Sequence, residues 1–203
     1  GGLEEIGKNL TVFEYKEDII VLDCGVAFPD EDMLGIDLVI PDMSYLVKNK
    51  ARIRGMVVTH GHEDHIGGIP YLLKEINVPI YGTPLTLGIL SKKLKEHGLL
   101  RGAKLMDVQP GDTIKLGEFR IEFIRVNHSI ADAVAIALHT PAGTVVHTGD
   151  FKIDSTPIDG DMIDLTRFGE LGRKGVLALL SDSTNVERGG FSMSERKVGH
   201  TFE

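Results

Sequence analysis

The apolar residues of this chain fall into short runs, many of them rich in β-branched side chains. Two pairs of runs predict β-hairpins, one over 10–25 that turns at 16–18 and one over 133–150 that turns at Pro-Ala-Gly. Strict alternation over 119–127 predicts a half-buried strand. The remaining runs that predict strands are 54–60, 78–82 and 175–182, of which the last two are expected to be buried.

Other segments have the periodicity of helices. Residues 69–76 have helical spacing, and a second helix is predicted to start at Thr83-Pro84 and to end at Gly98. The expected apolar face of this second helix comprises Leu87, Leu90 and Leu94. The polar segment 151–174 predicts mainly loop, with a helix near 161–171.

The order of these elements indicates an α/β fold. Because two hairpins argue against a purely parallel sheet, we expect mixed, α+β-like sheets that form a β-rich core covered by helices. Residues with candidate chemistry directly follow four of the apolar strands: His60, His128, Asp150 and Asp182. Since the ends of separate strands of one sheet can converge at one edge, we expect these side chains to lie together.

Composition limits the class of protein. The 203 residues suffice for one substantial core or for one domain and part of another, with 42% hydrophobic and 26% charged residues. No apolar run approaches the roughly 20 residues of a membrane span, and no signal peptide opens the chain. Cys24 is the only cysteine, which excludes an intrachain disulfide and a cysteine zinc cluster and favours a cytoplasmic setting. The net charge of −8 means that a polyanionic substrate would need local attraction, which a bound metal pair could supply.

The segment THGHEDHIGG, residues 59–68, concentrates four residues with metal-binding side chains: His60, His62, Asp64 and His65. One ion could hardly take all four from so tight a loop in good geometry, so we expect two ions to share them. His60 and His62 would serve one ion, and Asp64 and His65 the other. Each ion needs four or five ligands, and His128 and Asp150 are well placed to add to them, with Asp150 able to bridge.

Oxygen and imidazole ligands without thiolate suit two divalent ions, zinc or else manganese. The spacing differs from the His-Glu-x-x-His of zinc proteases, because His62 and His65 are only three residues apart. His97, His139 and His147 are each expected to be structural or exposed, although His147 could orient Asp150.

Several segments carry a resemblance to a known family. THGHEDHIGG resembles the metal-binding signature of the metallo-β-lactamase fold, and VLDCG, NHSI and HTGDFK match its other motifs in the same order. LGIDLVIPD, LKEHGLL and LLSDSTN are similar to the ribonuclease J family of β-CASP nucleases. The similarity extends over essentially the whole chain. It implies a metallo-β-lactamase αββα sandwich.

The resemblance implies a role for each matching residue. The metal ligands would be His60, His62 and His128 at the first ion, Asp64 and His65 at the second, and Asp150 as a bridge between them. Asp23 would not ligate but would fix the histidine loop through hydrogen bonds. Besides Asp64 and Asp150, Asp182 would act in catalysis, by supporting a later histidine that donates a proton.

The resemblance also divides the chain. Residues 1–190 would form the N-terminal part of the metallo-β-lactamase domain, and 191–203 would be the start of an inserted β-CASP domain, truncated here. The chain begins at Gly1-Gly2 without Met, so we expect a fragment that is inactive alone, with a further histidine ligand of the second metal outside it. His200 is expected to lie on the surface of the insertion's first helix.

The expected function is a two-metal ribonuclease. The resemblance implies 5′-to-3′ exonuclease activity on 5′-monophosphorylated RNA together with endonuclease activity, in mRNA decay and rRNA maturation. It also implies a homo-oligomer, a dimer or tetramer, and membership of an RNA-degradation complex. Two alternatives remain open: a small-molecule hydrolase of the same fold, such as a thioesterase or lactonase, and a non-catalytic metal-binding scaffold.

Overall fold

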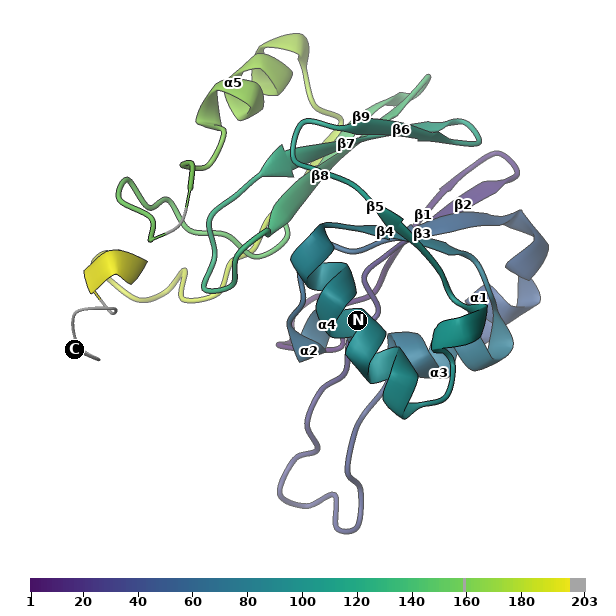
Figure 1. The fold of residues 1–203 in the computed structure, drawn as a ribbon. Helices are drawn as coiled ribbons and strands as arrows, with labels where there is room; N and C mark the ends of the chain where they lie inside the picture. Colours follow the sequence, from purple (N-terminus) through teal and green to yellow (C-terminus); the bar gives the residue numbers. More distant parts are fainter. Residues whose placement is uncertain (159, 198–203) are drawn as a thin grey trace.

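The computed structural model describes residues 1–158 and 160–197 of the chain, which form two β-sheets and the helices on either side of them (Figure 1). The expected start of a β-CASP insertion at 191–203 is therefore only partly described, and His200 lies outside the described residues.

The first sheet has the strand order β1-β2-β3-β4-β5, and the second has the order β10-β9-β8-β7-β6. The strands of the first sheet are β1 (Thr11–Tyr15), β2 (Asp18–Leu22), β3 (Ile53–Val57), β4 (Pro79–Gly82) and β5 (Lys104–Asp107). Those of the second are β6 (Thr113–Leu116), β7 (Phe119–Arg125), β8 (Val134–Thr140), β9 (Gly143–His147) and β10 (Ala178–Leu180). The helices are α1 (Ser44–Lys48), α2 (Glu63–Ile66), α3 (Ile69–Glu75), α4 (Pro84–Glu96) and α5 (Leu165–Lys174), with 3-10 turns η1 (Lys50–Arg52) and η2 (Leu100–Gly102).

Both sheets are mixed. In the first sheet, β1 pairs antiparallel with β2, whereas β2, β3, β4 and β5 run parallel to one another. In the second, β6 to β9 are antiparallel and β10 runs parallel to β9. This arrangement confirms the expectation of mixed sheets.

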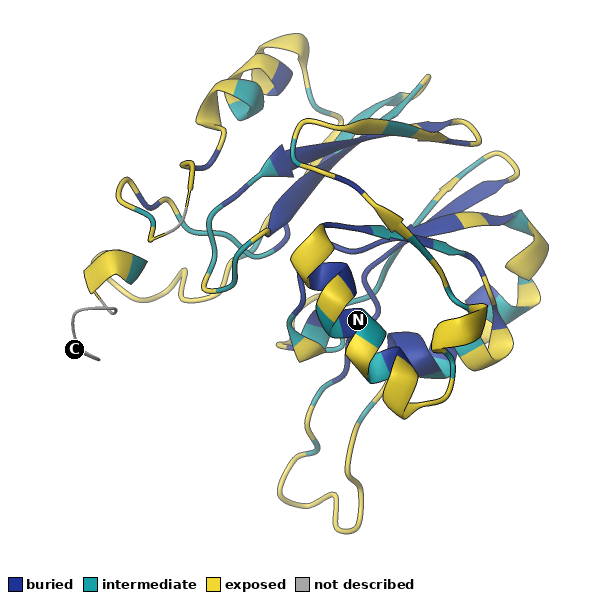
Figure 2. Cartoon of the chain, viewed as in Figure 1, coloured by how far each residue is buried: buried dark blue, intermediate teal, exposed yellow. Residues whose placement is uncertain are grey.

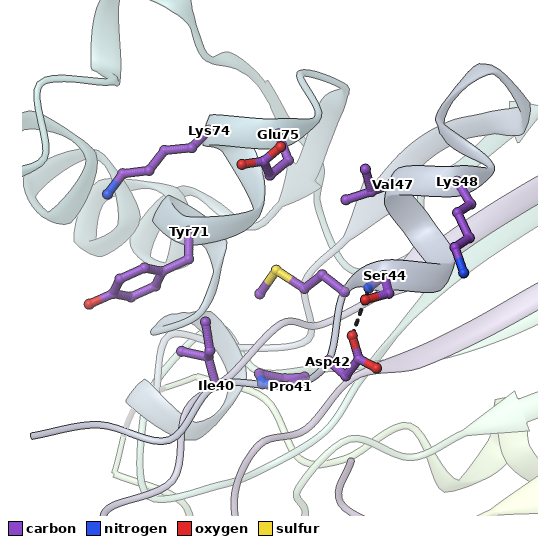
Figure 3. Close-up of a pocket in the computed structure, with 10 residues that line it drawn as sticks. Ile40, Pro41, Asp42, Ser44, Val47, Lys48, Tyr71, Lys74 and Glu75 are labelled. Carbon is purple, nitrogen blue, oxygen red and sulfur yellow. Dashed lines mark hydrogen bonds between the residues drawn. The ribbon is translucent and has the colours of Figure 1, made fainter. Parts of the chain in front are cut away.

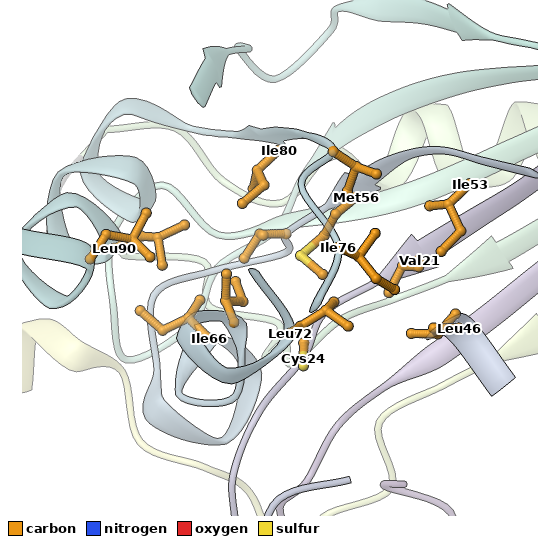
Figure 4. Packing of buried hydrophobic residues seen from close by; sticks show 14 of the residues in the cluster. Val21, Cys24, Leu46, Ile53, Met56, Ile66, Leu72, Ile76, Ile80 and Leu90 are labelled. Carbon is orange, nitrogen blue, oxygen red and sulfur yellow. The ribbon is translucent and has the colours of Figure 1, made fainter. Parts of the chain in front are cut away.

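Three apolar clusters hold the layers of Figure 1 together, and the positions of buried residues are dark blue in Figure 2. The first lies between the first sheet and helices α1 to α4, where residues such as Met56 and Ile80 meet Leu72 and Leu90 (Figure 4). The second fills the space between the sheets, and the third lies between the second sheet and α5. The order helix, sheet, sheet, helix is that of an αββα sandwich, which is the predicted architecture.

The register explains how each strand serves two clusters. Val21, Met56 and Ile80 are aligned across β2, β3 and β4, and all three face the helices. Their neighbours Leu22 and Val57, also aligned, face the second sheet. Because successive side chains of a strand point to opposite faces, continuous apolar runs are needed in strands that are covered on both sides.

Most predicted elements are confirmed. The hairpin over 10–25 turns at Lys16-Glu17, since Tyr15 pairs with Asp18. The helix expected over 69–76 is α3, and the one expected after Thr83-Pro84 is α4, which buries the predicted face. The hairpin over 133–150 is formed by β8 and β9.

Two predictions about burial were wrong. Strand β7 was expected to be half-buried, but α5 covers its outer face, so Glu122 and Ile124 are also buried. The run 175–182, which contains β10, was expected to be buried, yet Leu177 and Leu179 are 65% and 64% exposed in the described part of the chain, where β10 lies at the edge of its sheet. An apolar run predicts that a strand tends to be buried, but it does not identify the element that packs on each face of the strand.

The boundaries of other elements also differ from expectation. The helix expected near 161–171 is α5, which begins at Leu165 after the N-cap Asp164. Strands β5 and β6 were not predicted from the sequence, because each has only four residues and is largely exposed, which leaves no apolar pattern. Among the described residues, no helix has the length and apolarity needed to cross a bilayer.

A buried carboxylate attaches α5 to the second sheet. Glu122, on the outer face of β7, is 8% exposed and accepts hydrogen bonds from both Arg167 Nε and Arg167 Nη2. His139 Nε2 lies 3.0 Å from the same carboxylate. The Arg167 hydrogen bonds lower the pKa of Glu122, so the carboxylate is ionised and a partner is needed to offset its burial.

We predict that Arg167→Met destabilises the fold by about 1–3 kcal/mol, because the Glu122 carboxylate loses its charged partner while it stays buried. The lowered folded pKa means that this stabilisation exists above the ordinary glutamate pKa of 4.5 and is lost as the pH falls through the folded value. The difference from wild type should therefore shrink in acid. Denaturant unfolding at several pH values measures it, and Arg173→Met, on the exposed face of the same helix, is the matched control. Equal losses in both variants would contradict the role of Glu122.

Candidate metal centre

The predicted metal-binding residues lie together at one edge of the sandwich, but they come from both sheets. His60 follows β3 in the first sheet, whereas His128 follows β7 and Asp150 follows β9 in the second. The expectation that strand ends of a single sheet would converge was therefore wrong. Strands β7 and β9 are both antiparallel to β8, so their C-terminal ends share an edge, and sheet packing sets this edge against the end of β3.

The histidine loop is held by the segment that follows β2. Main-chain hydrogen bonds run from Cys24 N to His65 O at 2.8 Å, from Val26 N to Glu63 O at 3.2 Å, and from Gly68 N to Cys24 O at 2.8 Å. At Gly25 the two segments are so close that a Cβ atom would lie 1.5 Å from the Asp64 carbonyl oxygen. A glycine is therefore required at this crossing.

Three imidazole nitrogens form the first ligand group. His62 Nδ1 lies 3.1 Å from His60 Nε2 and 3.2 Å from His128 Nε2. A proton can link only one pair of these nitrogens at a time, whereas a divalent cation would accept all three lone pairs. These three side chains thus fit a metal ion.

The Asp150 carboxylate lies between this group and a second one. Its Oδ2 atom is 3.6 Å from His128 Nε2 and 3.9 Å from His60 Nε2. Its Oδ1 atom is 3.3 Å from His65 Nε2. One oxygen therefore faces each group, which is the arrangement that a bridging carboxylate requires.

The second group consists of Asp64, His65 and the shared Asp150. Asp64 Oδ2 lies 3.6 Å from His65 Nε2, and the Asp64 side chain is 36% exposed. The ligand atoms that lie within 4.8 Å of one another here are those of His60, His65 and Asp150, so Asp64 joins the group only through its contact with His65. The donor set, one imidazole and two carboxylates, suits zinc or manganese.

Asp23 is hydrogen-bonded to a ligand of the second group and to a residue that contacts a ligand of the first. Its carboxylate is 2% exposed and accepts hydrogen bonds from His65 Nδ1 at 2.8 Å, Thr59 N at 2.8 Å and Thr59 Oγ1 at 2.9 Å. Thr59 Oγ1 in turn lies 3.0 Å from His60 Nδ1. With its hydrogen donated to Asp23, this oxygen accepts from His60 Nδ1–H, which leaves the Nε2 lone pair of His60 free to bind a metal.

Thr59 is a residue that sequence reasoning missed, although it opens the THGHEDHIGG motif. Its hydroxyl links Asp23 to His60, and neither its residue type nor its spacing indicates that contact. The expectation that Asp23 fixes the histidine loop agrees with these contacts.

The environment gives the histidines opposite tendencies to ionise. Burial lowers the pKa of His60 and of His128, so both rings are neutral near pH 7 and have lone pairs available. For His65, burial also opposes the charge, but the charge of Asp23 and the contacts with Asp150 outweigh it and raise its pKa to about 10. Although burial disfavours the ionised form of Asp150, the hydrogen bond and charge of His65 lower the pKa of Asp150. The proton on His65 thus balances the carboxylates where a cation would otherwise do so.

The other candidate residues are not members of the two groups, although Asp182 and His147 lie near them. The charge of Asp182 opposes the lowering of the His128 pKa by burial, and the charge of Asp150 opposes the lowering of the His147 pKa by burial. The Asp182 carboxylate accepts a hydrogen bond from Thr184 N at 2.8 Å and so closes its own turn. His147 Nδ1 accepts from Gly149 N at 3.1 Å, next to Asp150. His139 contacts Glu122, and the ring of His97 lies 5.6 Å from that of Tyr71. Burial raises the pKa of the Cys24 thiol to about 12, which leaves it protonated.

A hollow of about 600 Å³ lies elsewhere, between α1 and α3 (Figure 3). Its lining includes Met43, Val47 and Tyr71 and contains no member of either ligand group. The candidate metal centre is therefore identified from its converging side chains and not from this hollow.

The sequence of this chain is similar to those of several ribonucleases J. Ribonuclease J of Synechocystis sp. is 56% identical over 200 residues, which cover 98% of this chain and 31% of that protein. Ribonuclease J 1 of Streptococcus pyogenes is 51% identical, over 100% of this chain and 36% of that protein, and ribonuclease J of Thermus thermophilus is 50% identical, over 100% and 37%. The chain thus spans about a third of the length of these curated relatives.

Solved structures share the fold at low identity. Unliganded yeast PDE1 is 14% identical, with a TM-score of 0.63 over 89% of this chain and 72% of that one. Zn²⁺-bound PqqB from Methylobacterium extorquens is 12% identical, with a TM-score of 0.55 over 87% and 62%. The family model of the metallo-beta-lactamase superfamily matches residues 4–174. With that match over most of its length and an αββα sandwich that brings the motif residues together, the chain belongs to the metallo-β-lactamase superfamily.

Proposed function

We propose that this chain contributes the metal centre of a ribonuclease that hydrolyses RNA phosphodiester bonds with two divalent ions, zinc or manganese. The observation that carries the proposal is the Asp150 carboxylate, with one oxygen toward each ligand group. The substrate class rests on the 45–56% identity to ribonucleases J, because the geometry alone suits other hydrolases of this fold.

Each residue of the centre has a proposed role. The first ion would be held by His60, His62 and His128, and the second by Asp64 and His65, with Asp150 shared. When bound, a pair of divalent ions makes a water nucleophilic near neutral pH and stabilises the negative charge that develops at phosphorus. Asp23 and Thr59 keep the ligand rings in the required tautomers.

Proton transfer would involve two carboxylates. Asp64 is half-exposed, so its carboxylate is open to solvent and can accept a proton beside the second ion. Asp182, at the end of β10, is proposed to support a histidine from elsewhere in the polypeptide that protonates the leaving oxygen. General acid assistance of this kind contributes roughly 10²–10⁴-fold to rates.

The proposal extends to the organisation and setting of the protein. Residues 1–190 would be the N-terminal part of the metallo-β-lactamase domain, and 191–203 would start an inserted β-CASP domain. The activity would combine 5′-to-3′ exonuclease and endonuclease action on 5′-monophosphorylated RNA in mRNA decay and rRNA maturation. A homo-oligomer in the cytoplasm, within an RNA-degradation complex, would carry it out.

We predict that the two ions differ in their response to pH. At the first group the pKa values of His60 and His128 are lowered, so its affinity should change little above pH 7. The second ion must displace the proton from His65, whose pKa is about 10, so its affinity should rise about tenfold per pH unit between pH 7 and 9. Stepwise Mn²⁺ titrations at several pH values test this. Equal pH slopes for the two ions would contradict it.

We predict that Asp64→Ala lowers the rate of RNA hydrolysis by at least about 100-fold. Loss of a residue that only hydrogen-bonds to a metal ligand lowers activity by about 10–100-fold, and loss of the ligand itself should cost more. RNA binding should survive, since affinity for RNA comes mainly from phosphate contacts spread over a surface. Cleavage and binding of 5′-monophosphorylated RNA by the complete protein measure both effects. The control is Glu63→Ala, which removes the neighbouring carboxylate, whose Oε1 faces Lys93 at 2.7 Å. Wild-type cleavage by the Asp64 variant would rule out the role.

A further inference from the structure

Asn9 lies against the second ligand group, although it is distant from that group in sequence. Its side-chain nitrogen Nδ2 is 3.1 Å from the main-chain oxygen of Asp64 and 3.2 Å from Asp64 Oδ2. The same atom is 3.1 Å from His65 Nε2. Asn9 therefore touches the two side chains that distinguish the second group from the first.

The main chain of Asn9 is anchored in the same place. Asn9 N donates to Asp64 O at 3.0 Å, and Asn9 O accepts from Gly25 N at 2.9 Å. The residue is thus inserted between the end of β2 and the histidine loop. Its backbone position does not depend on the side-chain contacts, so a side-chain substitution can test those contacts alone.

The orientation of the Asn9 amide follows from its partners. A main-chain carbonyl oxygen can only accept a hydrogen bond, so the amide atom beside Asp64 O must be the NH₂ nitrogen. One N–H is then donated to Asp64 O and the other to the Asp64 carboxylate. Both hydrogens are used on Asp64, so Asn9 does not occupy His65 Nε2, and a cation that displaces the His65 proton can bind there.

Asp64 has few other restraints. Its side chain is 36% exposed, and in residues 1–158 and 160–197 the only hydrogen-bond donor to its carboxylate is Asn9. A half-exposed carboxylate without such a donor samples several rotamers, and binding a metal would then have to restrict it. His60 of the first group differs, because its ring is buried and is held by Thr59.

We infer that Asn9 is a positioning residue for the second metal ion: its amide holds the Asp64 carboxylate beside His65 Nε2, so that Asp64 can join His65 and Asp150 when the ion binds. The inference rests on the proposed two-metal function. A carboxylate oxygen has lone pairs for a hydrogen bond and a metal at once, so Asn9 keeps its contact when the ion is bound. Partners of this kind are worth about 10–100-fold in metal affinity.

The test is a Mn²⁺ titration of the complete metal-free protein, followed by electron paramagnetic resonance. Loss of the free-ion signal gives the number and affinity of bound ions, and magnetic coupling between two bound ions reports that both sites are filled. We expect Asn9→Ala to weaken the second ion by about 10–100-fold and to leave the first unchanged. Asn77→Ala is the matched control, because Asn77 Nδ2 makes a similar bond to a main-chain oxygen, Gly102 O at 2.9 Å, on an exposed loop.

A second variant, Asn9→Leu, keeps a similar size but removes the donor without adding a charge. If the N–H groups of residue 9 position Asp64, Asn9→Leu should weaken the second ion about as much as Asn9→Ala does. Wild-type affinity for the second ion in Asn9→Leu would show that side chain 9 only fills space, and would overturn the inference.

Two other outcomes would also overturn it: wild-type affinity for the second ion in Asn9→Ala, or equal weakening of both ions, which would show a general role in folding the loop. Each of these leaves the proposed function intact. A wild-type protein that binds a single Mn²⁺ ion and shows no coupling would instead remove the two-metal proposal, and the inference with it.

Discussion

The buried carboxylate of Asp23 is the interaction on which the candidate metal centre depends. The residue follows β2 and has a left-handed backbone conformation, with a φ of 57°. Aspartate is enriched in this region of backbone angles. The carboxylate accepts hydrogen bonds from Thr59 and from His65. Thr59 in turn contacts His60 of the first ligand group, whereas His65 belongs to the second, so Asp23 links the two groups. A buried carboxylate without these donors would be costly, so the satisfied network defines one conformation of the loop.

The sandwich architecture supplies the second constraint. His128 and Asp150 reach the histidine loop only because the apolar cluster between the sheets holds the ends of β7 and β9 against the end of β3. That cluster contains Phe123, which is fully buried. Packing of this kind tolerates little displacement, so ligand atoms from two sheets can be held within a few ångströms of one another.

Different parts of the fold were predictable to different degrees. Long or strongly patterned elements such as α4 and the hairpins follow from local periodicity and from turn residues, which act over a few positions. The exposure of Leu179 and the burial of Glu122 do not, because each is decided by whether a distant element covers that face of the sheet. Likewise, the histidine cluster is evident in one short segment, whereas the contacts of Asn9 and Thr59 depend on how separate segments pack.

The sequence by itself determined the chemistry available to this protein: the types of ligand, their grouping around His60 and His65, and the family to which the motifs belong. Only the tertiary structure decided how the ligands are divided in space. It shows which oxygen of Asp150 faces which histidine, and it places Asn9 beside Asp64 across 55 residues of chain. The physical reason is that residue type sets what an atom can bind, whereas distance and direction between remote atoms are set by the packing of the sheets that carry them.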